Sequence, residues 1–246
     1  MSTKYNSFTA PSKPTKVHEE LSIVLLSGPN YKMRSYGPKQ LLKLHCGKTL
    51  IEYQIHALQT IFPNTELILS VGEDADKVIK NRPPNLKIVE NQLWQETNEV
   101  EYARLALNTT LSSRIIIINS DVFFDLEILK QIKSTDKSCL FYDDSGRLPD
   151  NEVGITVADK DFATIFSFKL PSKWCHIAQL VNDDIKIFKN ICADKARKKQ
   201  YLFEAFNAFL ERRTIRAVRS LSTKTYRIET SRDLEKIKNE AKNIDS

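Results

Sequence analysis

The fold class can be inferred from ten residues, LSIVLLSGPN, at positions 21–30. The first six form a short apolar run that is typical of a strand buried on both faces of a parallel sheet. Ser27, Gly28 and Pro29 end this run and indicate a turn. In an open α/β sheet such a turn lies at the carboxyl end of the strand, where ligands bind.

The rest of the chain continues this pattern by alternating helical and strand periodicities. Helices are predicted at 49–62, 100–107, 176–199, 201–212 and 232–242, and strands at 66–71, 86–89, 114–118, 140–142, 154–157, 165–168, 217–220 and 226–228. The alternation predicts a Rossmann-like α/β fold, with a mostly parallel sheet and helices on both faces. Residues 21–246 are predicted to form one domain.

The first twenty residues have a different composition. They mix Ser, Thr, Lys and Pro with few large apolar side chains, so they cannot bury enough surface to offset the entropy of ordering them. Residues 1–20 are therefore predicted to be a flexible arm, through which a partner or a second copy of the chain would bind.

Composition narrows the ligand class. The 246 residues are 41% hydrophobic and 28% charged, and 37 basic against 31 acidic residues give a net charge of +6. This excess favours anionic ligands such as phosphates, but the basic residues are scattered. The densest run, KARKK at 195–199, is interpreted as a solvated helix face, and no specific nucleic acid is expected.

Location and redox state are also suggested by composition. The four cysteines have no CxxC spacing, so reduced thiols are expected rather than zinc or disulfides. No apolar segment is long enough to span a bilayer, and the N-terminus lacks the apolar core of a signal peptide. A soluble, cytoplasmic protein that does not bind membranes is expected.

The segment LSGPNYKMRSYGPKQLL, residues 26–42, follows the first strand and precedes the first long helix. Backbone amides of a glycine-containing turn surround anionic oxygens well. Lys32, Arg34 and Lys39 would add charge-assisted hydrogen bonds to a triphosphate.

Four segments in order resemble the sugar-phosphate nucleotidyltransferase superfamily, which has a GT-A-like fold. They are the loop after the first strand, PKQLL with GKTLIE at 38–52, NSDVFF at 119–124 and YRIETSRDL at 226–234. The last two are similar to the family's Gly-Asp-x-x-Phe and E-I-D-T-x-x-D-L motifs. WQETN at 94–98 looks most like the phosphocholine cytidylyltransferase branch.

The resemblance implies an enzyme that transfers a nucleoside monophosphate unit from a nucleoside triphosphate, with CTP or UTP favoured, to a small phosphorylated sugar or alcohol. It assigns catalysis to Lys39 and Asp121, and Mg²⁺ binding to Asp121 and Glu229. The residues that it assigns to the nucleotide are Leu26, Ser27, Gly28, Asn30, Lys32, Arg34, Lys39 and Asn98.

The chain departs from the family pattern at three positions. Asn30 replaces the second loop glycine, although asparagine tolerates a left-handed backbone. Lys32 offers a point charge where the family has an arginine fork. Glu229 is one methylene longer than the usual aspartate, and Thr230 with Asp233 also fits a helix cap. Asn98 is likewise placed to cap the helix that follows it.

Two other functions remain open for these reasons. The first is a catalytically impaired member of the family that serves as a binding or assembly module. The second is a GT-A glycosyltransferase that uses a nucleotide sugar, although Asp121 and Asp125 do not form the Asp-x-Asp expected after the fourth strand. Cys175 and His176 lack a third partner at metal-ligand spacing and are interpreted as packing residues.

Overall fold

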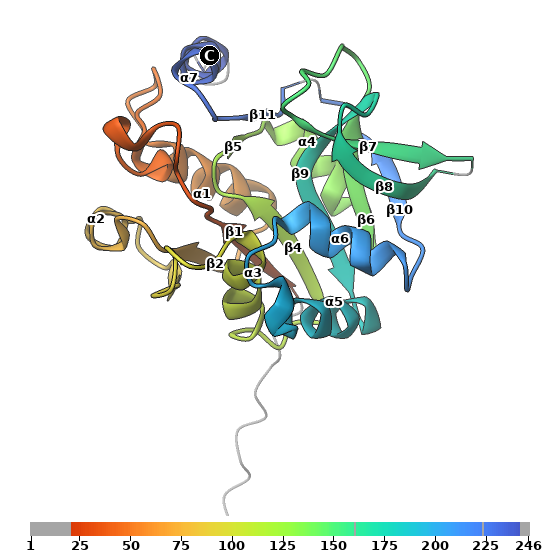
Figure 1. Cartoon of the computed structure of the whole chain (residues 1–246). Coiled ribbons are helices and arrows are strands. Elements are labelled where there is room, and N and C mark those ends of the chain that lie inside the picture. The colour runs from red at the N-terminus through yellow and green to blue at the C-terminus, as the bar shows by residue number, and fades with distance from the viewer. Residues whose placement is uncertain (1–20, 160, 223, 242–246) are drawn as a thin grey trace, which may run out of the picture.

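A computed structural model describes residues 21–159, 161–222 and 224–241 (Figure 1). The predicted arm at 1–20 lies outside the described residues. The strands are β1 (Leu21–Leu26), β2 (Glu66–Val71), β3 (Lys87–Glu90), β4 (Arg114–Asn119), β5 (Val122–Phe123), β6 (Cys139–Asp143), β7 (Val153–Ala158), β8 (Phe162–Phe168), β9 (Ser172–Val181), β10 (Arg216–Arg219) and β11 (Tyr226–Arg227). The α-helices are α1 (Leu50–Ile61), α2 (Ala75–Lys80), α3 (Glu99–Leu107), α4 (Leu126–Lys133), α5 (Asp183–Ala193), α6 (Leu202–Leu210) and α7 (Ser231–Ala241).

One sheet runs through the molecule in the order β3-β2-β1-β4-β9-β6-β10-β8-β7, and β5 pairs separately with β11. The strands from β3 to β4 are parallel. From β9 onward the sheet is mixed, because β9 runs antiparallel to β4 and β6 while β10 is parallel to β6. The predicted α/β class, with a central sheet covered by helices, is confirmed.

The register brings the ends of three strands to one level. Leu26 at the end of β1 is opposite Ser70 of β2 and Asn119 of β4. The turns that follow these strands therefore meet at one edge of the sheet. This edge holds the loop after β1 and the turn that contains Asp121.

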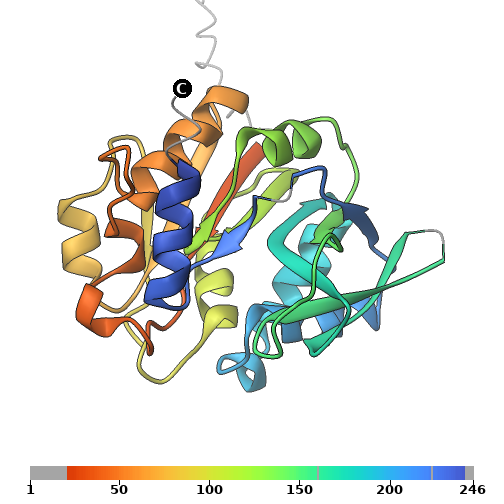
Figure 2. The ribbon, with the colours of Figure 1, turned by 90° about the horizontal axis from the view of Figure 1, so that it is seen from above.

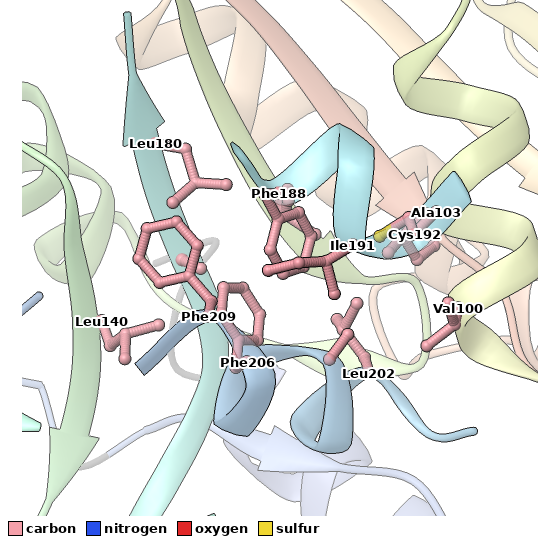
Figure 3. Close-up of a cluster of buried hydrophobic side chains, with 14 of the residues drawn as sticks. Val100, Ala103, Leu140, Leu180, Phe188, Ile191, Cys192, Leu202, Phe206 and Phe209 are labelled. Atoms are coloured by element: carbon pink, nitrogen blue, oxygen red, sulfur yellow. The ribbon is translucent and has the colours of Figure 1, made fainter. Parts of the chain in front are cut away.

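Helices cover both faces of the sheet, each over its own apolar core. On one face α3, α5 and α6 enclose a cluster rich in phenylalanine. Figure 3 shows Phe188, Phe206 and Phe209 of this cluster pointing toward one another. On the other face α1, α2 and α4 pack against Ile23, Leu25 and their neighbours. Alternate residues of β1 thus enter opposite cores, as expected for a strand buried on both sides.

The helix predicted from residue 176 to 199 is wrong in its first part. Residues 176–181 belong to β9, and α5 begins only at Asp183. β9 lies between β4 and β6 and is buried along nearly its whole length. Polar Gln179 inside this strand is explained by its amide, which donates to the carbonyl oxygens of Thr135 and Lys137. Because Gln179 interrupts the apolar residues at 177–181, their spacing also fits a helix.

A third, smaller apolar cluster attaches α7 to the loop that follows β1. Ile237 and Leu234 of α7 pack with Met33, Leu42 and Leu50. Figure 2 shows α7 in dark blue beside α1. The C-terminal helix therefore holds the loop at 26–42 against the body of the sheet.

Cys46, Cys139, Cys175 and Cys192 are free in the structure. Within the described ranges, no helix combines the length and the apolar character needed to cross a membrane.

Gly72, directly after β2, is a position where the fold has no room for a side chain. An added Cβ would lie against the Tyr102 hydroxyl and 2.7 Å from Trp94 Cβ. Because Tyr102 is fully buried, it cannot move aside. We predict that Gly72→Ala lowers the free energy of unfolding by about 1–3 kcal/mol, measured by urea denaturation.

Gly146→Ala is the matched control, because a Cβ there would meet nothing within 4 Å. This control should unfold like the parent chain. Equal stability of the two variants would contradict the steric account of Gly72.

Candidate active site

The centre of the site is an ion pair between Lys39 and Asp121. Lys39 Nζ donates to Asp121 Oδ2 at 2.9 Å, although the two residues are 82 positions apart. Both side chains are largely buried, with exposed fractions of 12% and 11%. The structure thus brings together the two residues to which the sequence assigned catalysis.

Buried hydrogen bonds fix the backbone on both sides of this pair. The Gln40 amide donates to the hydroxyls of Ser27 and Ser120 at 2.7 and 2.8 Å, which joins the turns after β1 and β4. Gln54 of α1 donates to the carbonyl oxygen of Val122 at 2.7 Å. Lys39 and Asp121 are therefore held by residues that are their immediate neighbours in the chain.

Arg227 of β11 adds a second cation, to which the sequence had assigned no role. Its Nε lies 3.2 Å from Asp121 Oδ2, and its Nη2 lies 2.7 Å from Glu99 Oε1. Its Nη1 lies 4.0 Å from Glu229 Oε1. The signal was present in the motif YRIET, because the similar family motif begins with a glutamate at the position of Arg227.

The electrostatics of the site follow from this arrangement. Burial alone would raise the pKa of Asp121, but the charges of Arg227 and Lys39 outweigh it and hold that pKa far below its usual range. Burial alone would lower the pKa of Arg227, and Asp121, Glu99 and Glu229 raise it instead. Both groups are permanently charged at neutral pH.

Glu99 is the most buried member of this group, with a side chain only 4% exposed. It begins α3, and its Oε2 accepts a hydrogen bond from the backbone N–H of Leu202. Its Oε1 accepts from Asn119 as well as from Arg227. The carboxylate therefore links the parallel part of the sheet to α6.

The predicted metal ligands Asp121 and Glu229 both face a cation, but that cation is Arg227. Glu229 Oε2 also accepts from Lys32 Nζ at 2.7 Å. Asp121 Oδ1 is buried and accepts no hydrogen bond from the described residues. The described residues contain no group of three or more His, Cys, Asp or Glu side chains able to hold a metal ion. This set of residues, as arranged, does not fit Mg²⁺.

The cap that competed with the metal role of Glu229 is present. Asp233 accepts hydrogen bonds from the backbone N–H groups of Glu229 and Thr230, and from the Thr230 hydroxyl. Glu229 therefore precedes a capped helix and also contacts two cations with its side chain. Asn98 likewise caps α3, since its side chain accepts from the Glu99 N–H.

The loop after β1 is closed onto Glu73, which follows β2. The Asn30 N–H donates to Glu73 Oε2 at 3.3 Å, and Arg34 Nε lies 2.9 Å from Glu73 Oε1. Ser27, Gly28, Asn30, Lys39 and Asp121 line the cleft beneath, which has a volume of only about 20 Å³. A carboxylate thus occupies amide and guanidinium donors that an anionic ligand would use.

Leu26, Lys32 and Asn98, which were also assigned to the nucleotide, do not line this cleft. Lys32 lines the neighbouring pocket rather than the cleft itself. Leu26 is buried in the core at the end of β1, and Asn98 is 9% exposed at the start of α3.

An aromatic pocket of about 180 Å³ opens on the other side of the ion pair. Its walls include three cations, Lys32, Lys39 and Arg227, the two carboxylates Glu99 and Glu229 that pair with them, and a group of aromatic rings that the sequence did not predict. These aromatic residues are Tyr31, Phe168, Trp174, His176, Tyr201 and Phe203. They come from the loop after β1, from β8, β9 and α6, and from the residue before α6, so no local motif could reveal them.

His176 lies where this pocket meets the ion pair. Its backbone has φ +56°, in the left-handed region that is rare for a non-glycine residue. Nδ1 of His176 and Nε1 of Trp174 are buried and have no hydrogen-bond partner among the described residues. Strained backbone and unpaired polar atoms of this kind concentrate at functional sites. Its neighbour Cys175 is fully buried, and burial raises the pKa of the thiol to about 12.

Comparison with solved structures shows that the fold is a known one. The CTP:phosphocholine cytidylyltransferase of Streptococcus pneumoniae is 16% identical, with a TM-score of 0.72 over 90% of this chain and 99% of that one. The inositol-1-phosphate CTP transferase of T. maritima is 16% identical, with a TM-score of 0.73 over 92% and 96%. This chain has the nucleotidyltransferase fold.

A third structure extends the likeness to a sugar phosphate enzyme. A putative glucose-1-phosphate thymidylyltransferase of Bacillus anthracis is 13% identical, with a TM-score of 0.72 over 91% of this chain and 96% of that one. No family model and no curated protein sequence matches the chain. The fold predicted from the four motifs is thus confirmed by structure, at an identity too low for sequence comparison to detect.

The burial of His176 generates a pH prediction. Desolvation lowers the pKa of His176 well below its ordinary value of 6.5, and Arg227, Lys173 and Lys39 lower it further against the opposing charge of Asp121. Above pH 6.5 the imidazole is neutral in the folded and unfolded chains. Below it only the unfolded chain takes up the proton, so this group lowers the free energy of unfolding by up to about 1.4 kcal/mol per pH unit.

We predict that His176→Asn, which suits a positive φ, removes this component. Urea unfolding at several pH values between 7.5 and 5 would show a shallower loss of stability in the variant, whatever its absolute stability. Identical slopes would mean that His176 takes up a proton in the folded state.

Proposed function

We propose that this protein transfers a nucleoside monophosphate unit from a nucleoside triphosphate to a small phosphorylated sugar or alcohol and releases pyrophosphate. The observation that carries the proposal is the position of the Lys39–Asp121 pair. It lies at the carboxyl ends of β1 and β4 and borders both the narrow cleft and, through Lys39, the aromatic pocket. A reaction that joins two anions needs two adjacent sites with a positive charge between them.

The narrow cleft supports a nucleotide site once its loop opens. Gly28 and Asn30 supply backbone amides, and Lys39 supplies positive charge inside the cleft. Arg34 adds positive charge at its edge, where it pairs with Glu73. A triphosphate would compete with the Glu73 carboxylate for these donors. CTP or UTP remains the favoured nucleotide because of the resemblance at residues 94–98.

The aromatic pocket supports the acceptor site. Small-molecule sites typically have mostly apolar walls and a few convergent polar groups, and here Lys32, Lys39 and Arg227 converge on aromatic walls. The rings would contact the carbon skeleton of the acceptor, and Lys32 would hold its phosphate. Lys39 and Arg227, which contact Asp121 of the narrow cleft, would lie between the two substrates and bind the triphosphate. The size of the pocket suits a small phosphorylated alcohol or sugar.

In the proposed reaction a phosphate oxygen of the acceptor attacks the α-phosphorus of the nucleotide. The new bond joins that oxygen to the α-phosphorus, and the bond from the α-phosphorus to the oxygen bridging it to the β-phosphorus breaks. Pyrophosphate leaves with the bonding electron pair, and no covalent intermediate with the protein is needed. Lys39 would neutralise charge that develops on the α-phosphate, which is the kind of preorganised contact that acts on a transition state. Asp121 and Glu229 have no role as Mg²⁺ ligands in this reaction, because their arrangement around Arg227 does not fit the ion.

A second candidate is supported by one observation, the mutual pairing of charges throughout the site. Lys39, Lys32, Arg34 and Arg227 each already contact a carboxylate. This arrangement would suit a catalytically impaired binding module. In that case the chain would bind nucleotide or a partner without turnover.

The test is pyrophosphate release with each of the four nucleoside triphosphates and a panel of small phosphorylated sugars and alcohols. We predict release with at least one combination, a loss of about 10²- to 10³-fold in Lys39→Ala, and a comparable loss in Asp121→Asn. Both variants should keep folding cooperatively.

Lys77→Ala is the matched surface control, because among the described residues the exposed side chain of this lysine forms an ion pair only with Asp74. It should turn over like the parent. No release with any combination would refute the proposed transfer and favour the binding module. Undiminished release in Lys39→Ala would place the catalytic site elsewhere.

A further inference from the structure

The strongest unexplained feature of the site is the guanidinium of Arg227. It is surrounded by Asp121, Glu99 and Glu229, with contacts of 3.2, 2.7 and 4.0 Å respectively. Its side chain is 17% exposed. An arginine in contact with carboxylates from three different segments is central to the site, not a surface feature.

The charges around it are already balanced. Three carboxylates, Asp121, Glu99 and Glu229, face three cations, Arg227, Lys39 and Lys32. When no nucleotide is bound, a divalent ion added to this group would leave two uncompensated positive charges beside the buried Arg227, Glu99 and Asp121, which is unfavourable. In the nucleotide-free site the arginine and a metal ion thus exclude one another.

The backbone fixes the arginine in this place. Arg227 is paired with Val122 in the β5–β11 ladder, and the Ile228 N–H donates to the carbonyl oxygen of Asp121 at 2.9 Å. Arg227 and Glu229 therefore flank the residue that is hydrogen-bonded to Asp121. Moving the guanidinium away would leave buried Glu99 without its cation.

One edge of the guanidinium is suited to a ligand. Nε and Nη2 hold Asp121 and Glu99, whereas Nη1 lies beyond hydrogen-bond distance of Glu229. Arg227 also lines the aromatic pocket. A planar guanidinium matches phosphate oxygens well and never loses its proton.

We infer that the Arg227 guanidinium is the fixed cation of this site, in the place that the sequence assigned to Mg²⁺, and that the site binds phosphate groups without a divalent ion. The inference rests on the proposed function for the identity of its ligand, a nucleoside triphosphate. The exclusion of a metal ion follows from the ion pairs of Arg227 and does not depend on the proposed function.

The first experiment uses the unmodified full-length chain. CTP and UTP are titrated by calorimetry in EDTA and in Mg²⁺, and Mn²⁺ binding is followed by electron paramagnetic resonance without nucleotide. We expect nucleotide affinities within about threefold of each other in the two buffers, and no stoichiometric Mn²⁺ site. Affinity more than about tenfold weaker in EDTA, or one bound Mn²⁺ per chain, would overturn the inference.

The second experiment removes the guanidinium. Arg227→Met should lower the Tm, because it leaves carboxylates uncompensated. It should also gain a Mn²⁺ site and regain several degrees of Tm on adding the ion. Arg227→Lys keeps the positive charge and should gain no such site.

Arg104→Met is the matched control, since within the described part of the chain Arg104 forms an ion pair only with Glu101 on α3, and it should show no response to Mn²⁺. A folded Arg227→Met that binds no Mn²⁺, or an Arg227→Lys that binds it equally well, would contradict the inference. If Arg227→Met does not fold even with Mn²⁺, the inference is tested by Mn²⁺ binding to the unmodified chain and to Arg227→Lys. Absence of nucleotide binding in both buffers would refute the proposed function, while the Mn²⁺ measurements would still test the metal exclusion.

Discussion

The structure of the site depends on the contacts of one guanidinium. Arg227 connects Asp121 after β4, Glu99 at the start of α3 and Glu229 before α7, which are distant in the chain. Its own position is set by the short pairing of β5 with β11. Breaking a buried ion pair of this kind by removing one partner costs about 3–5 kcal/mol. The ion pairs of this guanidinium therefore hold distant segments of the chain together and also form part of the ligand site.

The fold explains why ion pairs are needed between the two parts of the sheet. The parallel strands β1, β2 and β4 bring polar turns to one edge, and the mixed strands with α6 bring the aromatic wall. Each half has its own apolar contacts, but the pocket lies where they meet. Glu99, which is bound to both Arg227 and the N–H of Leu202, joins these halves across the site. The position of α7 against the loop after β1 completes the enclosure.

The sequence contained enough information to predict the fold and the central pair. Lys39 and Asp121 belong to motifs that follow strands directly, and strand register places such residues at a common edge. The sequence could not predict the aromatic pocket, because its rings come from elements whose pairing is not local. It also misassigned residues 176–181, where a central strand carries a polar glutamine that pairs with loop carbonyls. The motif at 226–234 predicts an acidic metal ligand at Glu229 and assigns no role to Arg227, two positions earlier.

The central claim is that a triphosphate binds between the loop after β1 and the fixed cations Lys39 and Arg227. A crystal structure of the protein soaked with CTP and Mg²⁺ tests it most directly. The account predicts that the loop moves away from Glu73, that phosphate oxygens lie within hydrogen-bond distance of Lys39 and Arg227, and that the guanidinium stays between Asp121 and Glu99. A nucleotide bound elsewhere, or a metal ion coordinated by Asp121 and Glu229 with Arg227 displaced, would contradict it.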